Sequence, residues 1–371
     1  MQKEDSFLPD LLCLKLKEKL HIRKEEGNYR QIQLQKTSKI DFFTNDYLGV
    51  SKNDLIKLPK KSNFKGSTGS RLLSGNSKEA LSCEKKVAQF FLAESSLIFN
   101  SGYDANIGLI STIIGREDII IYDEKIHASL RDGIVLSRGK SYSFSHNDLM
   151  DLQKKLDKFS TIKNVYVIIE SLYSMDGERA PLKDISNLCE KFRTKLIVDE
   201  AHSVGIFGEN GKGLCVENNI HKKVFARIIT FSKAYGFIGA AVLAKEEVIQ
   251  FLINFCRSFI YTTALPPLAY YKIEKILKKD LSRERNALIK NIQYYTDCVN
   301  SAQIGPIQFI KCSEFMHFEE IVRKLKKVKI FQKIIKYPTV PKSEEGIRLT
   351  FHSFNTKKEI EILLSILNPV K

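Results

Sequence analysis

Two separated segments in the middle of the chain carry residues that suit one cofactor. The apolar run KLIV ends at Asp199, in the segment KLIVDEAHSVG, and Lys233 follows later in the segment RIITFSKAYG. A lysine in a loop rich in hydroxyl residues and glycine can bind the aldehyde of pyridoxal phosphate covalently. An acidic residue at the end of a buried strand can keep the pyridine nitrogen of that cofactor protonated. Asp199 and Lys233 therefore predict a pyridoxal phosphate site.

The cofactor's phosphate needs backbone amides at the start of a helix, together with hydroxyl groups. Ser101, Gly102 and Tyr103 follow the apolar segment SSLIFN, where we expect a helix to begin. Thr230 and Ser232 lie just before Lys233 and carry hydroxyls. We expect these two groups of residues to meet around the phosphate.

The elements that must position these residues are short, apolar and mostly β-branched. Helix-like polar segments separate them, which is typical of a mostly parallel α/β sheet buried on both faces. In such sheets the ligand lies at the carboxyl ends of the strands. The predicted strands cover residues 95–100, 118–123, 164–170, 195–200 and 226–232. The polar residues that follow them are Ser101 to Tyr103, Asp123 with His127, Glu170 with Ser174, Asp199 with His202, and Lys233.

The rest of the chain predicts two flanking parts. A helix over residues 8–27, followed by short strands at 32–35 and 39–43, forms an N-terminal part that covers residues 1–45. We predict a large cofactor-binding domain over residues 46–270. From about residue 271 to residue 371 the pattern predicts a smaller C-terminal α/β domain.

Composition excludes several classes of protein. Of the 371 residues, 43% are hydrophobic, including 23 Phe and 14 Tyr, which is too apolar for a disordered chain. The longest apolar runs are far shorter than the roughly 20 residues of a membrane-spanning helix. Seven scattered cysteines without a CxxC pair favour neither a disulfide scaffold nor a zinc site, so we expect no metal. No signal peptide is evident, and we expect a soluble, cytoplasmic protein that does not bind membranes.

The net charge is +16, from 59 Lys and Arg residues against 43 Asp and Glu residues. The basic residues are spread along the chain and mostly stand beside acidic or apolar residues, as they do on solvated helix faces. This distribution argues against a nucleic-acid partner. A small molecule that carries phosphate is the simpler expectation.

Longer motifs surround these residues, and together they resemble the α-oxoamine synthases, pyridoxal phosphate enzymes of fold type I. The resemblance runs from about residue 30 to the C-terminus. It implies a large domain with a mostly parallel seven-stranded sheet between helices. The motifs are NDYLG (45–49), GSTGSRLLSGN (66–76), SGYDAN (101–106), HASL (127–130), HND (146–148), ESLYSMDG (170–177), DEAHSVG (199–205), TFSKAYGFIGAA (230–241), FIYTTALPP (259–267), PTVP (338–341) and IRLT (347–350).

The resemblance implies a role for each matching residue. Lys233 corresponds to the lysine that binds the cofactor and acts as general base and acid. Asp199 corresponds to the partner of the pyridine nitrogen. His127 corresponds to the histidine that stacks on the ring and contacts substrate, while His202 and Ser174 correspond to the residues that hold the ring hydroxyl. The positions around the phosphate correspond to Ser101, Gly102, Tyr103, Thr230, Ser232 and, from the partner subunit of a homodimer with shared active sites, Thr263.

Four further residues correspond to positions that contact substrate. Arg348 corresponds to the arginine that pairs with the amino-acid carboxylate, for which a guanidinium fork is suited. Asn45 corresponds to a neighbour of that carboxylate, and Thr339 to another substrate contact. Arg30 is the candidate for an arginine near the N-terminus. One departure is visible, because Ala80 and Cys83 stand where relatives often have histidine and leucine.

The family joins an amino acid to an acyl thioester with loss of CO2 and of the thiol. The DEAHS sequence resembles the family members that use L-alanine and a pimeloyl thioester, or serine palmitoyltransferase, and the GAAV sequence after Lys233 resembles the former. We therefore expect L-alanine and a pimeloyl thioester, carried by coenzyme A or by a carrier protein. The alternatives within the family are 2-amino-3-ketobutyrate ligase, 5-aminolevulinate synthase and serine palmitoyltransferase. A different alternative is a basic, non-catalytic binding protein on the same scaffold.

Overall fold

A seven-stranded sheet forms the centre of the structure, a computed structural model that describes residues 11–27, 29–32, 40–57, 66–314, 318–335 and 342–367. Strand β8 runs antiparallel to both of its neighbours, and the other neighbouring pairs are parallel. The predicted mostly parallel sheet is therefore confirmed. In spatial order its strands are β2 (Ser95–Phe99), β8 (Ala240–Ala244), β7 (Ala226–Thr230), β6 (Lys195–Asp199), β5 (Val165–Glu170), β3 (Ile119–Asp123) and β4 (Lys140–Phe144).

Burial explains why these segments form strands. Every residue of β5, β7 and β8 is buried, as expected for strands covered on both faces. All five individually predicted strands are present. The two that were not predicted have weaker signals, because β4 (KSYSF) is a polar edge strand and β8 (AAVLA) is rich in alanine.

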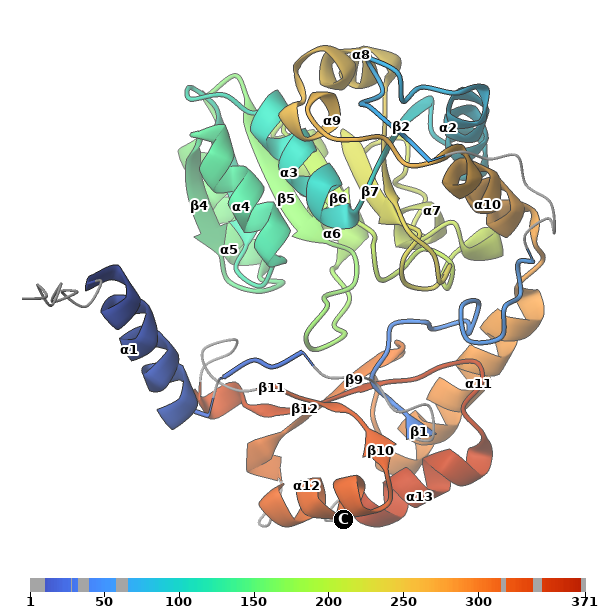
Figure 1. The fold of residues 1–371 in the computed structure, drawn as a ribbon. Helices are drawn as coiled ribbons and strands as arrows, with labels where there is room; N and C mark the ends of the chain where they lie inside the picture. The colour runs from blue at the N-terminus through green and yellow to red at the C-terminus, as the bar shows by residue number, and fades with distance from the viewer. Residues whose placement is uncertain are drawn as a thin grey trace, which may run out of the picture.

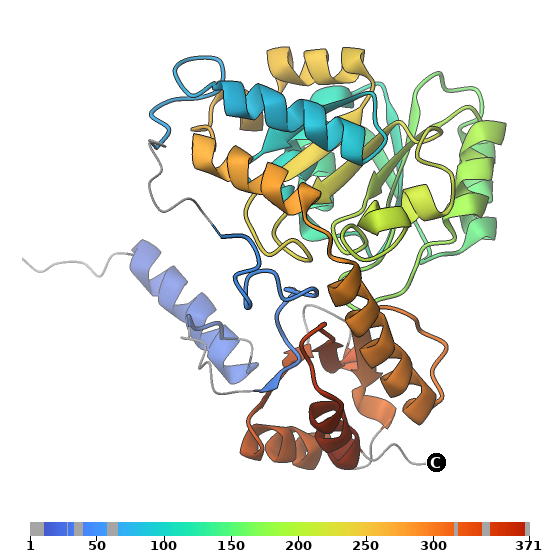
Figure 2. The same cartoon turned by 90° about the vertical axis from the view of Figure 1, so that its right-hand side faces the viewer.

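Helices cover both faces of this sheet. Figure 1 shows α3 and α4 together in front of it, and Figure 2 shows α2 and α10 side by side on the face that the second view presents. Ala80 and Cys83, the positions that depart from the family pattern, are fully buried in α2, so both have a packing role. The helices of this part are α2 (Lys78–Phe90), α3 (Gly102–Ile113), α4 (Ala128–Ser137), α5 (Leu149–Lys158), α6 (Leu182–Lys191), α7 (Leu214–Glu217), α8 (Glu246–Phe255), α9 (Arg257–Ile260) and α10 (Pro267–Lys278).

The C-terminal elements form a second, smaller group (Figure 1). A three-stranded antiparallel sheet has the order β11 (Lys333–Ile335), β12 (Gly346–Thr350), β9 (Ile307–Lys311). Three helices accompany it: α11 (Ser282–Val299), α12 (Phe318–Lys327) and α13 (Lys357–Leu367). This group presents β12, and with it Arg348, toward the edge of the large sheet at which β5 and β6 end.

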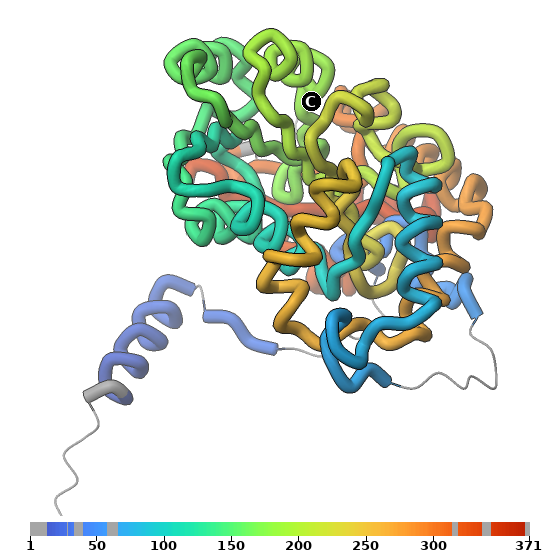
Figure 3. Tube along the Cα trace, turned by 90° about the horizontal axis from the view of Figure 1, so that it is seen from above, coloured from blue at the N-terminus to red at the C-terminus, as the bar shows by residue number. Residues whose placement is uncertain are grey.

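The N-terminal strand joins the C-terminal group. The strand predicted over residues 39–43 is present as β1 (Ile40–Asp41), and it pairs in parallel with β10 (Ile330–Phe331). Of the strand predicted over residues 32–35, residues 33–35 lie outside the described residues. Helix α1 (Leu11–Glu25) agrees with the predicted helix, and the side chains of residues 13–25 are all exposed. Seen from above in Figure 3, α1 lies apart from the other elements.

The predicted division into domains at residues 45/46 and 270/271 stays a prediction. Helix α10 crosses the second of these positions and packs against α2 of the large group. Among the described helices, none is both long enough and apolar enough to cross a membrane.

Candidate active site

Lys233 lies in the loop after β7, with its ammonium nitrogen against a histidine. The distance from Lys233 Nζ to His202 Nε2 is 2.6 Å. Burial lowers the pKa of Lys233 to about 8, although the negative charge of Asp199 opposes this shift. Burial also lowers the pKa of His202 well below its usual range, and the nearby charge of Lys233 acts in the same direction. The site therefore holds a neutral imidazole beside a lysine that loses its proton near neutral pH.

Asp199 ends β6 and is almost fully buried. Its Oδ1 accepts a hydrogen bond from the backbone N–H of Ala201 at 2.8 Å, and its Oδ2 accepts one from Asn106 Nδ2 at 2.8 Å. The amide of Asn106 also donates to Ser129 Oγ at 2.8 Å. The carboxylate is thus held between β6, α3 and α4, and its oxygens can still accept a further hydrogen bond from a ring nitrogen.

Glu170 and Asp199 are register partners on the neighbouring strands β5 and β6. Glu170 Oε1 accepts the backbone N–H of His127 at 2.6 Å, which fixes the residue before α4. Burial and the adjacent charge of Asp199 raise the pKa of Glu170 well above its ordinary value. In a buried site the charge of one carboxylate opposes the ionisation of its neighbour, so the protonated form of Glu170 is favoured beside Asp199.

His127 is the N-cap residue of α4. Its Nδ1 lies 2.7 Å from Ser129 Oγ, so the imidazole is fixed at the start of the helix. Burial lowers the pKa of His127, while the charge of Asp199 opposes the shift and that of Lys233 adds to it. These effects place His127 near both Asp199 and Lys233, the two residues on which the prediction of the site began.

The first turn of α3 and the end of β7 enclose an open site that is lined by hydroxyl groups. Gly102 begins α3, and a Cβ atom on it would meet nothing nearer than Thr230, at 3.9 Å from Cβ and 4.0 Å from Oγ1. The Thr230 and Ser232 hydroxyls lie 2.8 Å apart. The amides of Gly102 and Tyr103 have no intrahelical acceptor, because they belong to the first turn. Amides, hydroxyls and the positive end of a 12-residue helix together suit a phosphate.

Ser101 and Tyr103 contact other groups with their side chains. Ser101 caps α3, because its Oγ accepts the N–H of Asp104 at 3.1 Å and lies 2.7 Å from Asp104 Oδ2. The Tyr103 hydroxyl donates to Asp132 Oδ2 at 2.6 Å, and 47% of the residue is exposed. Backbone amides are therefore what these two residues can offer a phosphate.

Arg348 on β12 is 7% exposed, and no ion pair joins it to a carboxylate among the described residues. Its Nε donates to the carbonyl oxygen of Ser174 at 2.7 Å, and its Nη1 donates to Thr350 Oγ1 at 2.9 Å. Its Nη2 donates to Asn45 Oδ1 at 3.1 Å. Within the part of the chain that the structure describes, neutral groups alone hold this guanidinium, so it is ready to pair with the carboxylate of a ligand.

Two predicted residues are not joined to this cluster. Thr263 is exposed, and its carbonyl oxygen accepts a hydrogen bond from Asn100 Nδ2 at 2.9 Å. Arg30 is exposed in the segment after α1, and no contact in the structure links it to Lys233. Thr339 lies outside the described residues. The roles of these three residues remain predictions.

The structure adds residues that the motifs contained but that had no assigned role. The Tyr47 hydroxyl lies 2.5 Å from His202 Nδ1, and it donates to Asn45 Oδ1 at 3.3 Å. Asn106 donates to Asp199, Ser129 contacts the imidazole of His127, and Glu170 accepts the backbone N–H of His127. Their presence in the NDYLG, SGYDAN, HASL and ESLYSMDG motifs was the available signal, since spacing alone does not reveal which neighbour a polar side chain contacts.

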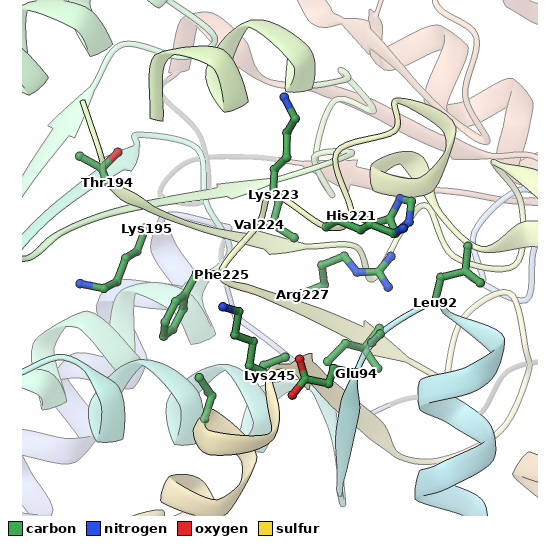
Figure 4. A pocket seen from close by; sticks show the side chains of 15 residues that line it. Leu92, Glu94, Thr194, Lys195, His221, Lys223, Val224, Phe225, Arg227 and Lys245 are labelled. Atoms are coloured by element: carbon green, nitrogen blue, oxygen red, sulfur yellow. The ribbon is translucent and has the colours of Figure 1, made fainter. Parts of the chain in front are cut away.

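A separate cavity of about 580 Å³ lies at the opposite, amino-terminal edge of the parallel strands (Figure 4). It is basic, but several of its cations already have partners. Lys195 donates to Asn164 Oδ1 at 2.8 Å, Lys223 pairs with Glu190 at 2.8 Å, and Arg227 pairs with Glu200 at 3.3 Å. Figure 4 shows Lys223 directed away from the other labelled cations. Three of the basic side chains that line this cavity are therefore already held by partners.

Comparison with known proteins gives the same class as the fold and the site. The model of the family described as aminotransferase class I and II matches residues 37–367. A putative 8-amino-7-oxononanoate synthase from Methanococcus vannielii is 37% identical over 366 residues, which is 94% of this chain and 96% of the relative.

Two solved structures have the same fold. A crystal structure of 8-amino-7-oxononanoate synthase from Francisella tularensis has 31% identity and a TM-score of 0.72, and the match covers 89% of this chain and 97% of that one. Serine palmitoyltransferase from Sphingomonas wittichii has 25% identity and a TM-score of 0.85, covering 97% and 96% of the two chains.

The chain therefore belongs to the aminotransferase class I and II family, and within it to the 8-amino-7-oxononanoate synthases. Its fold is that of the fold-type-I pyridoxal phosphate-dependent transferases. The enzymes of this group are acyltransferases, as the sequence motifs predicted.

Proposed function

We propose that the chain uses pyridoxal phosphate to condense L-alanine with a pimeloyl thioester, giving 8-amino-7-oxononanoate, CO2 and free thiol, a step of biotin biosynthesis. The α-carbon of alanine forms a bond with the acyl carbon of the thioester. The carbon–sulfur bond breaks and the thiol leaves with a proton, while the alanine carboxylate leaves as CO2. The acyl group is carried by coenzyme A or by a carrier protein, and the net charge of +16 suits either of these phosphate-bearing donors.

The residues of the site fit this cofactor. Lys233 would bind it covalently, and Asp199 would accept a hydrogen bond from its ring nitrogen. His127 would lie over its ring, and His202 and Ser174 would hold its ring hydroxyl. The space beside Gly102, with the amide of Tyr103 and the hydroxyls of Thr230 and Ser232, would take the phosphate, with Ser101 fixing the helix start. When bound, pyridoxal phosphate supplies an electron sink for the α-carbon of the amino acid.

The proximity of Arg348 to Lys233 is the observation that carries the proposal. Both residues belong to one hydrogen-bonded chain, which passes through His202, Tyr47 and Asn45. The guanidinium would orient an amino acid by its carboxylate, and Lys233, which belongs to the same hydrogen-bonded chain, would take and return the α-proton. A lysine whose pKa is lowered to about 8 by burial is an effective base at neutral pH.

A homodimer with shared active sites is part of the proposal. Thr263 is exposed on the segment beside Asn100, next to the proposed phosphate place, and its hydroxyl would serve the site of the partner subunit. Thr339 and Arg30 are proposed as further substrate contacts. Neither nucleic acid nor membrane is a proposed partner, and we propose that the protein is cytoplasmic.

The cofactor itself gives the first test. Purified protein given pyridoxal phosphate should gain an absorption band in the near-ultraviolet to visible range, and adding L-alanine should change that band. The Lys233→Ala variant should lack the covalent band. If the unmodified protein took up no cofactor, the enzyme proposal would fail and the non-catalytic alternative would stand.

A further inference from the structure

Tyr47 is fully buried at the start of the large group, and its hydroxyl lies between the two functional ends of the site. On one side it lies 2.5 Å from His202 Nδ1. On the other side it lies 3.3 Å from Asn45 Oδ1, which also receives the Nη2 hydrogen of Arg348 at 3.1 Å. This hydroxyl therefore connects the histidine beside Lys233 with the arginine that suits a carboxylate.

The donors and acceptors along this chain fix one arrangement of protons. The ammonium of Lys233 can only donate, so a neutral His202 ring accepts at Nε2 and carries its proton on Nδ1, and the hydroxyl of Tyr47 then donates to Asn45 Oδ1. The Tyr47 oxygen is then free to accept from His202 Nδ1–H, which leaves the lone pair of Nε2 facing Lys233 Nζ at 2.6 Å. Without the phenol oxygen, neither the tautomer nor the rotation of the His202 ring would be specified from the Nδ1 side.

Charges around the ring agree with this arrangement. The groups that act on His202 are Lys233, Arg348 and His127, and with burial they lower its pKa well below the usual range. Burial raises the pKa of Tyr47, so the phenol keeps its proton despite the nearby Arg348. The chain therefore consists of a neutral phenol and a neutral imidazole between two cations.

We propose that Tyr47 is a positioning residue of this site. Its hydroxyl holds His202 in the orientation and tautomer that face Lys233, and it links this pair through Asn45 to Arg348. The inference rests on the proposed function, because it assigns Lys233 and Arg348 to the same amino-acid substrate. A carboxylate bound to Arg348 would compete with Asn45 for the Nη2 hydrogen, and the link would carry that change toward His202.

The test compares Tyr47→Phe with unmodified protein, both loaded with cofactor. The variant loses the hydrogen bond between Arg348 and the Tyr47 hydroxyl, but Arg348 keeps its bonds to Asn45, Thr350 and the carbonyl oxygen of Ser174, so the KM for L-alanine should change less than about threefold. Misorientation of His202 should lower kcat by about 10- to 100-fold. The pH at which the cofactor band changes, measured without substrate, should move by about half a unit or more, since the tautomer beside the cofactor is no longer fixed.

A matched control is Tyr166→Phe, which also removes one buried phenol hydroxyl. Tyr166 lies on β5 and packs against Phe225, with a ring-centroid distance of 5.8 Å, and Lys195 covers its ring. This variant should keep kcat and the pH titration of the band. A second variant, Asn45→Ala, keeps the phenol but removes its acceptor, so it should move the same titration and also raise the KM for L-alanine.

The decisive comparison is between the effect of Tyr47→Phe in the unmodified protein and its effect in a His202→Gln variant. In a His202→Gln background, Tyr47→Phe should have little further effect on kcat or on the titration, because the ring that it positions is absent. Equal effects of Tyr47→Phe in both backgrounds, or a titration and kcat within twofold of the unmodified protein, would overturn the inference. Failure of the proposed function looks different, because the unmodified protein would then bind cofactor but not respond to L-alanine, while the band titration would still report on Tyr47.

Discussion

At the scale of single residues, the site depends on groups whose protonation is shifted by burial. Lys233 is held near a neutral histidine, and its pKa is lowered to about 8 from an ordinary value of 10.5. Glu170 has the opposite shift for a carboxyl group, because burial and the charge of Asp199 favour the protonated form. Both shifts have consequences that can be measured separately.

The rate at which cofactor-free protein takes up pyridoxal phosphate should rise with pH, with a midpoint near 8. Only the neutral amine of Lys233 is a nucleophile, and at pH 7.5 a pKa of about 8 leaves roughly a quarter of it neutral. The rate can be followed by the growth of the absorption band at a series of pH values. A midpoint near 10.5 would mean that Lys233 is not shifted.

The free energy of unfolding of the Glu170→Gln variant should increase relative to that of the unmodified protein as pH rises. The unfolded chain loses the Glu170 proton above the ordinary pKa of 4.5, whereas the folded protein keeps it, so this group's contribution to stability is lost with rising pH. Glutamine keeps an acceptor for the N–H of His127 and has no proton to lose. Urea unfolding should show a larger advantage in unfolding free energy for the variant over the unmodified protein at pH 8 than at pH 5. An equal difference at both pH values would contradict the raised pKa of Glu170.

At the scale of elements, loops at the strand ends must approach one another closely. Gly205, in the loop after β6, has a φ of +84°, and a Cβ on it would lie 2.6 Å from the Cβ of Ala234, the neighbour of Lys233. The left-handed conformation and the missing side chain are therefore both needed for the approach of this loop to the lysine loop.

The Gly205→Ala substitution should lower the free energy of unfolding by about 2 to 4 kcal/mol, through backbone strain and overlap. It should also weaken cofactor binding, because Lys233 is displaced. The control is Gly27→Ala, which has a φ of +68° but meets nothing within 4 Å, so it should cost only about 1 kcal/mol and leave cofactor binding unchanged. Urea unfolding and cofactor titration measure the two effects, and equal losses for both variants would contradict the close approach.

The sequence patterns predicted the strands well, but they did not predict the contacts between distant segments. The apolar, β-branched runs gave β2, β3, β5, β6 and β7, and their ends carry Lys233, Asp199 and Glu170, because strand ends are local features. The contact between Tyr47 and His202 joins positions 155 residues apart, and the one between Asn45 and Arg348 joins positions 303 apart. Such contacts depend on how the two groups of elements meet, which no periodicity encodes.

At the scale of the whole molecule, exposed apolar side chains gather where a partner subunit is expected. Leu73 is 82% exposed and Tyr261 is 73% exposed. They lie on two segments that are joined to each other, because the N–H of Ala264 donates to the carbonyl oxygen of Gly69 at 3.0 Å. Thr263 belongs to the second of these segments, so a surface that covers them would also bring Thr263 to an interface.

We expect the protein to sediment as a dimer with twice the mass of one chain. Leu73→Asp should shift it toward monomer and weaken cofactor binding, because a charge is costly in a buried apolar interface. Met150→Asp, at a position on α5 that is 74% exposed, should change neither. A monomeric unmodified protein with full cofactor affinity would exclude shared active sites.

The most direct test of the account is thiol release by cofactor-loaded protein, with pimeloyl-coenzyme A as donor and L-alanine, glycine or L-serine as the amino acid. The account predicts release that depends on L-alanine, together with a product of the mass of 8-amino-7-oxononanoate, and no release by Lys233→Ala. Release with glycine or serine only would keep the family and contradict the substrate. No release with any amino acid, even with a pimeloyl carrier protein as donor, would contradict the proposed reaction.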